Sequence, residues 1–155
     1  RWLKSMIYLV KSIETIHTVT IGWSNTNRAS ILKDKIDFVS FHYYEDLNDL
    51  ATAYADIKKD NPNKLVVLSE FGISSYSGFW NLFSGSQEAQ LAYHQKAQAI
   101  FKAQKVPFYN WTLYDFEQIP KEVVGQLPWR VNPQKEFGFI DAKGTKKASF
   151  SAISK

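Results

Sequence analysis

A short run of the chain, Lys64-Leu-Val-Val-Leu-Ser-Glu70, constrains its fold more than any other segment. The run is almost continuously apolar, which predicts a β-strand whose two faces are both buried. Strands of this kind occur in parallel sheets that helices cover on both sides. The run therefore predicts an α/β fold.

Helical and strand-like patterns alternate along the rest of the 155 residues. Helices are expected at 2–16, 29–35, 47–59, 86–104 and 148–154, strands at 17–22, 36–43, 64–70 and 106–113, and long loops at 72–85 and 114–134. Strict alternation implies parallel strands with right-handed crossovers. Four βα units fit an open α/β sheet or half of a barrel, because a complete (β/α)₈ barrel needs about 250 residues.

Composition excludes several classes of function. The net charge of +4 is scattered rather than arranged in a basic stripe with aromatic residues, so no nucleic-acid partner is expected. There is no cysteine, which excludes disulfides and thiolate zinc sites. No apolar run reaches the roughly 18 residues that span a bilayer. Aromatic residues make up 15% of the chain, which suits either a large core or a cleft in which rings stack on sugars.

Sequence motifs exclude further chemistry. His17, His42 and His94 lie on separate predicted elements and no HExxH motif is present, so neither a metal nor another cofactor is expected. The chain also lacks a GxGxxG fingerprint and the GxSxG elbow of serine hydrolases.

The ligand site of a parallel α/β fold lies at the C-terminal ends of its strands. The residues at these ends include Trp23, His42, Tyr44, Glu70 and Trp111. A carboxylate among aromatic and hydrogen-bonding side chains fits the cleavage of glycosidic bonds, because it can stabilise or attack an oxocarbenium-like centre. The sequence therefore predicts Glu70 as catalytic and the other four residues as substrate-binding.

Each of these residues also has a structural interpretation. Glu70 could cap the loop that follows its strand, although a charge at the end of a buried strand is costly unless paired. His42 and Tyr44 could be hydrogen-bonded structural residues, and Trp111 could belong to the core. For Trp23 the two interpretations are evenly balanced.

Four segments resemble clan-A glycoside hydrolases, which have a (β/α)₈ TIM-barrel fold. Ile36-Asp-Phe-Val-Ser-Phe-His-Tyr-Tyr44 resembles their sixth strand, Lys64 to Gly72 the seventh and Phe108 to Leu113 the eighth, and Phe137 to Lys147 is similar to their ending. The cellulase- and mannanase-like families, especially family 5, share these features. The resemblance implies that residues 1–155 form a single partial barrel domain, the C-terminal half with strands five to eight.

The resemblance also implies roles. Glu70 occupies the position of the nucleophile in retaining hydrolysis of β-glycosidic bonds, His42 and Tyr44 would orient it, and Trp111 would form the floor of the sugar site. The substrate would be a polysaccharide or oligosaccharide, and the enzyme would be secreted, periplasmic or on the cell surface.

The family's acid/base is a Glu in an Asn-Glu pair at the end of strand four, and this chain contains no Asn-Glu dipeptide. We therefore expect an N-terminal half of the barrel, in the same or a separate chain, to supply it. Two alternatives remain open, an inactive carbohydrate-binding half barrel and a half barrel that self-associates.

Overall fold

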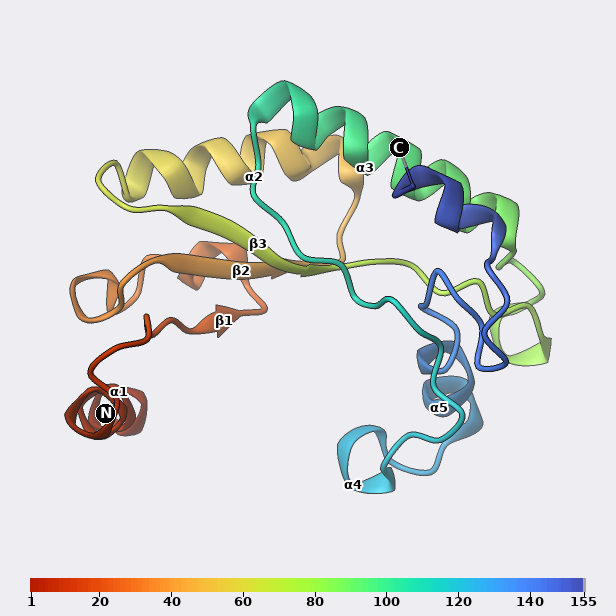
Figure 1. Cartoon of the computed structure of the whole chain (residues 1–155), viewed down its shortest axis with the longest axis horizontal. Coiled ribbons are helices and arrows are strands. Elements are labelled where there is room, and N and C mark those ends of the chain that lie inside the picture. The colour runs from red at the N-terminus through yellow and green to blue at the C-terminus, as the bar shows by residue number, and fades with distance from the viewer. Residues whose placement is uncertain (155) are drawn as a thin grey trace. The chain divides into compact units, whose positions relative to one another are not determined.

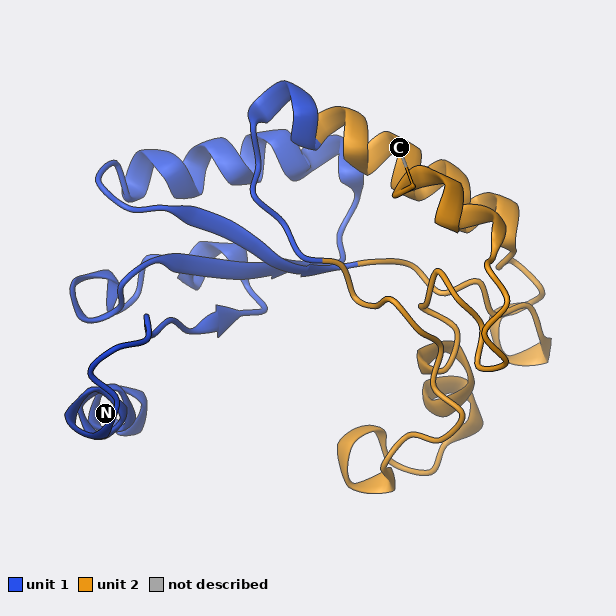
Figure 2. Cartoon of the chain, in the orientation of Figure 1, with its two compact units in different colours: residues 1–71, 101–109 blue, residues 72–100, 110–155 orange. Residues whose placement is uncertain are grey.

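The computed structural model describes residues 1–154, and the chain divides into two compact units, which Figure 2 shows in different colours. Unit 1 comprises residues 1–71 and 101–109, and unit 2 comprises residues 72–100 and 110–155.

Unit 1 is built on a parallel three-stranded sheet in the order β1-β2-β3 (Figure 1). Its strands are β1 (Gly22–Trp23), β2 (Val39–Tyr43) and β3 (Val66–Phe71). Its helices are α1 (Trp2–Ile13), α2 (Leu47–Asp60), the short 3-10 turns η1 (Thr26–Arg28) and η2 (Lys33–Lys35), and the last residues of α3 (Gln87–Gln104). The parallel sheet confirms the predicted α/β class.

Helix α2 covers one face of this sheet. It begins after Asp46, whose carboxylate accepts a hydrogen bond of 2.8 Å from the backbone N–H of Asn48, a favourable N-cap. Its buried residues recur at helical spacing and are Leu47, Leu50, Tyr54 and Ile57. The ring of Tyr54 lies 6.5 Å from that of Phe41 on β2. This packing defines the helix-covered face of the sheet.

The first predicted strand is much shorter than expected. The strand predicted at 17–22 is reduced to Gly22–Trp23. One backbone hydrogen bond, from the N–H of Asp37 to the carbonyl of Val19 at 2.9 Å, and several side-chain contacts hold the preceding residues. The carboxylate of Asp37 accepts the N–H of Val19 at 2.7 Å, and the hydroxyl of Thr20 donates to the carbonyl of Phe38 at 2.6 Å.

The prediction of a fourth strand at 106–113 is wrong. It pairs with β3 only through an isolated parallel bridge between Leu68 and Phe108. The N–H of Tyr109 still donates to the carbonyl of Leu68 at 2.8 Å, but from Asn110 onward the chain belongs to unit 2. One hydrogen-bonded step is too little for a regular ladder.

Unit 2 contains most of α3 and several short elements, namely η3 (Phe79–Asn81), α4 (Lys121–Val124), α5 (Pro128–Gln134) and the 3-10 helix η4 (Ala148–Ala152). The predicted loop at 114–134 thus holds two helices. In α5, Pro128 occupies the first turn, where proline favours a helix because its missing N–H has no intrahelical partner to lose. The helix expected at 148–154 is a shorter 3-10 turn.

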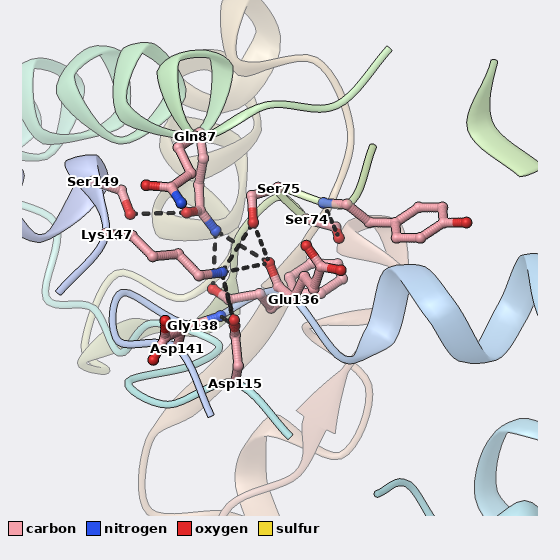
Figure 3. A network of polar contacts seen from close by, with 12 residues as sticks. Ser74, Ser75, Gln87, Asp115, Glu136, Gly138, Asp141, Lys147 and Ser149 are labelled. Carbon is pink, nitrogen blue, oxygen red and sulfur yellow. Dashed lines mark hydrogen bonds and ion pairs between the residues drawn. The ribbon is translucent and has the colours of Figure 1, made fainter. Parts of the chain in front are cut away.

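A buried polar network holds unit 2 together (Figure 3). The ammonium group of Lys147 forms an ion pair of 2.7 Å with Asp115 and donates to the hydroxyl of Ser75 at 2.9 Å. Asp115 also accepts the backbone N–H of Gly138 at 2.7 Å. The side chains of Lys147 and Asp115 are only 4% and 8% exposed. The network therefore joins three segments that are far apart in the sequence.

A second set of contacts fastens α3 to the C-terminal segment. The side chain of Gln90 donates to the carbonyls of Ile73 at 2.9 Å and Phe137 at 3.2 Å, and accepts from the hydroxyl of Ser149 at 2.8 Å. One turn further along α3, the ring of His94 packs 4.5 Å from that of Phe139. Burial lowers the pKa of His94 to about 4, so its imidazole is neutral at neutral pH.

We predict that Lys147→Met lowers the free energy of unfolding by about 3 kcal/mol, because it leaves the carboxylate of Asp115 buried without its charged partner. Chemical denaturation measures this change. Adding Asp115→Asn removes the stranded charge and should restore part of the loss. Lys143→Met, at an exposed lysine on the same segment, is the matched control and should change stability by less than about 0.5 kcal/mol. An equal loss in both single variants would contradict a role for the ion pair.

We also predict a stability that falls as the pH is lowered from about 6.5 to about 4 through His94. The unfolded chain takes up a proton at the ordinary histidine pKa, whereas the folded chain does so only near pH 4. This single group accounts for a loss on the order of 3 kcal/mol across that window. Denaturation curves at several pH values should show a flatter acid limb for His94→Gln than for the wild type. Parallel limbs would exclude this origin of the acid sensitivity.

Candidate active site

A β-bulge in β3 determines where the carboxylate of Glu70 points. Phe41 on β2 pairs with Leu68, but the next residue, His42, pairs with Glu70, so Ser69 is an extra residue in β3. Without the extra residue, alternation along the strand would put Glu70 beside Tyr43 on the helix-covered face. With it, Glu70 shares the opposite face with His42.

Two side chains of β2 and its C-terminal end contact the Glu70 carboxylate. The phenol of Tyr44 donates a hydrogen bond of 2.5 Å to Oε1. Nδ1 of His42 lies 3.4 Å from Oε2. Each carboxylate oxygen therefore has its own neighbour, and these contacts fix the orientation of the group. The structure brings together three of the five residues that the sequence predicts for the site.

The Glu70 carboxylate is shielded but accessible. The side chains of His42 and Glu70 are 28% and 26% exposed, and Tyr44 is exposed. The apolar residues Phe41 and Leu68, which precede them on the two strands, are fully buried. The Glu70 carboxylate thus lies at the edge of an apolar sheet, accepts a hydrogen bond from Tyr44, has His42 as a second neighbour and stays open to solvent on one side.

Gly22 makes room for the imidazole of His42. A Cβ atom built at Gly22 would lie 2.7 Å from Nε2 of His42, closer than such contacts occur. The backbone of Gly22 does not have the positive φ that only glycine favours, so the close approach is what excludes a side chain there. Sequence reasoning missed both Gly22 and Ser69. A glycine at the end of a strand is a signal of such close approach.

Trp23 and Trp111 belong to different units of the chain. Trp23 pairs in register with Phe41, and its indole N–H is buried without a hydrogen-bond partner among residues 1–154. Trp111 belongs to unit 2, where its ring lies 5.8 Å from that of Phe116 and is partly exposed. Their roles in substrate binding stay predictions.

Within residues 1–154, no group of three or more His, Cys, Asp or Glu side chains is arranged to hold a metal ion. In the same part of the chain, no helix is long and apolar enough to cross a membrane.

No protein-family model matches the chain, and no curated protein sequence matches it either. Several solved protein structures do match the chain. The β-glucuronidase of Ruminococcus gnavus in complex with uronic isofagomine matches 98% of this chain with a TM-score of 0.75 at 17% sequence identity. A putative β-galactosidase from Bacteroides fragilis matches 95% with a TM-score of 0.73 at 18% identity. A Rhizomucor miehei β-1,3-glucanosyltransferase, an active-site mutant in complex with laminaritriose, matches 95% with a TM-score of 0.71 at 16% identity.

The chain spans only part of these proteins, 27% of the glucuronidase, 24% of the galactosidase and 55% of the glucanosyltransferase. At such low identity the matches establish the fold. It is a mixed α/β fold that corresponds to part of larger TIM-barrel glycosidases.

We predict that Gly22→Ala destabilises the chain by about 1 to 3 kcal/mol, because the new methyl group forces His42 out of its position. Chemical denaturation of the single and double variants measures the coupling. In a His42→Ala background the methyl group meets no imidazole, so the same substitution should have almost no cost. A cost that is equal in both backgrounds would show that the contact with His42 is not its origin.

Proposed function

We propose that this chain is the nucleophile-bearing part of a retaining β-glycosidase, with Glu70 as the nucleophile. The observation that carries the proposal is the arrangement around Glu70, in which Tyr44 contacts one carboxylate oxygen and His42 the other. A nucleophile must be held at a fixed angle to the anomeric carbon, and two neighbours on one adjacent strand provide this.

In the first step, Oε of Glu70 forms a bond to the anomeric carbon while the bond to the glycosidic oxygen breaks and its electron pair goes to the leaving group. In the second step, water displaces Glu70, so the product regains the original β configuration. Tyr44 and His42 position the carboxylate throughout. Trp111 and Trp23 are assigned to the sugar, whose apolar C–H face stacks on aromatic rings.

The leaving oxygen needs a proton, and one carboxylate cannot both attack and protonate it. We assign this acid to a second carboxyl group, on a segment in the same or a separate chain that completes the barrel. Retaining enzymes hold the two groups about 5–5.5 Å apart.

The exposed apolar side chains of α1 support a missing neighbour. Only Ile7 of this helix is buried, whereas Trp2 and Ile13 are 71% and 77% exposed. A helix with apolar residues facing water is usually covered in the complete protein. The likeness to parts of a glucuronidase, a galactosidase and a glucanosyltransferase supports the same interpretation, since each of those names denotes action on a glycosidic bond.

Covalent trapping tests the assignment of Glu70 separately from the missing acid. Dinitrophenolate leaves without protonation, and a 2-fluoro substituent slows the second step, so a dinitrophenyl 2-fluoro-β-glycoside accumulates the glycosyl-enzyme. Glucose, mannose, galactose and glucuronic acid derivatives cover the main sugar classes. Mass spectrometry should locate the sugar on the peptide that contains Glu70.

The matched control is Glu45→Gln, which removes an exposed carboxylate a few residues along the chain from His42 and should leave labelling unchanged. Glu70→Gln should abolish it. Labelling of another carboxylate, or of none by any of the four reagents, would contradict the proposed role.

A further inference from the structure

Unit 2 carries an exposed cluster of aromatic side chains, here called the aromatic patch, formed by Phe79, Trp80 and Trp129. The ring of Trp80 lies 5.2 Å from that of Phe79 and 5.5 Å from that of Trp129. Trp80 and Trp129 are 44% and 48% exposed although they touch each other. The cluster is thus assembled but open to solvent on one side.

The loop that carries Trp80 is fixed by hydrogen bonds. The side chain of Asn81 accepts the N–H of Gly78 at 2.9 Å and donates to the carbonyl of Tyr76 at 2.5 Å. A Cβ atom at Gly85 would lie 1.9 Å from the backbone carbonyl oxygen of Tyr76, so only glycine fits there. A Cβ atom at Gly78 would lie 2.2 Å from the hydroxyl of the same tyrosine, whose side chain would have to move. The loop therefore holds the patch in one shape before any ligand arrives, which lowers the entropic cost of binding.

At the tip of this loop, two residues combine a strained backbone with exposed side chains. Leu82 and Phe83 both have left-handed backbones, with φ of 53° and 56°. This conformation costs about 1–2 kcal/mol for each residue that is not glycine. Both side chains point into solvent rather than into a core. Strain that burial does not offset is typical of binding surfaces.

Helix α5 brings Trp129 to the patch and is tied to the same loop. The side chain of Asn132 donates to the phenol of Tyr76 at 3.4 Å, and the hydroxyl of Ser74 donates to the carbonyl of Pro133 at 2.6 Å. Trp129 and Asn132 lie three positions apart, on the same side of the helix.

A hollow of about 440 Å³, lined by both apolar and polar side chains, adjoins α5 and includes Asn132 in its lining. Its other polar side chains are the amides of Gln118 and Gln126 and the ammonium groups of Lys121 and Lys135. Amides both donate and accept hydrogen bonds, as the hydroxyl groups of a sugar do. The hollow and the patch thus offer hydrogen bonds and flat apolar surface along one helix.

We propose that the aromatic patch and this hollow form a binding site for a glycan chain within unit 2. The apolar C–H face of one pyranose ring stacks on Trp80 and Trp129, and hydroxyl groups of the next sugar meet the amides. Such a pairing of aromatic surface with a few polar groups is typical of small-molecule sites. The proposal does not depend on Glu70 being a nucleophile.

Native electrophoresis through gels that contain laminarin, hydroxyethylcellulose or glucomannan tests the proposal. We expect at least one of these polysaccharides to retard the wild-type chain. The apparent Kd should rise about tenfold or more in Trp80→Ala and in Trp129→Ala, as expected when a central aromatic contact is lost. Trp80→Phe keeps a ring and should retain most of the binding.

Trp2→Ala is the matched control, because it removes another exposed tryptophan from helix α1. It and Glu70→Gln should bind like the wild type, and circular dichroism establishes that all variants are folded. The proposal is overturned if no polysaccharide retards the wild type or if Glu70→Gln abolishes binding. It is also overturned if the Trp80 and Trp129 variants bind polysaccharide as well as the wild type does. Light scattering that shows a dimer in the wild type and a monomer in Trp80→Ala would likewise overturn it, since the patch would then join two copies of the chain.

Discussion

The extra residue in β3 is the constraint on which the candidate site depends. A strand with regular alternation would send Glu70 to the face that α2 covers, where a carboxylate would meet the aromatic core and lose its water. The bulge at Ser69 reverses the alternation for the last residues of the strand. Phe71 then returns to the core, where it is buried, and Glu70 faces His42. This one irregularity thus keeps Phe71 in the core and places Glu70 beside His42.

Much of unit 1 could be predicted from the sequence, because its signals are local. The apolar run before Glu70 and the helical spacing of Leu50, Tyr54 and Ile57 each specify an element directly. The strand predictions at 17–22 and 106–113 failed for a different reason. Their residues favour extended backbone, but ladder pairing depends on neighbours that no local pattern records. Helix α5 was missed because two prolines suggested a loop, although Pro128 stands where a helix tolerates it.

The candidate site, too, could be predicted from the sequence only in part. Glu70, His42 and Tyr44 were predicted from their places at the ends of strands, and the structure brings their side chains together. The register shift at Ser69 and the space that Gly22 leaves for His42 depend on two strands at once, so neither could be deduced from one of them. Lys147 is a further example, because its side chain is buried against Asp115. Its burial depends on a partner 32 positions away, which no local pattern indicates.

The role that we propose for Glu70 is attack on the anomeric carbon rather than donation of a proton to the leaving group. Chemical rescue distinguishes the two roles. With Glu70→Ala, a dinitrophenyl β-glycoside and sodium azide, the small anion can enter the space left by the carboxylate and attack from the nucleophile's side. We predict an α-glycosyl azide, identified by the anomeric coupling constant in the NMR spectrum. A β-glycosyl azide would contradict it, because that product arises when azide replaces the base that activates water.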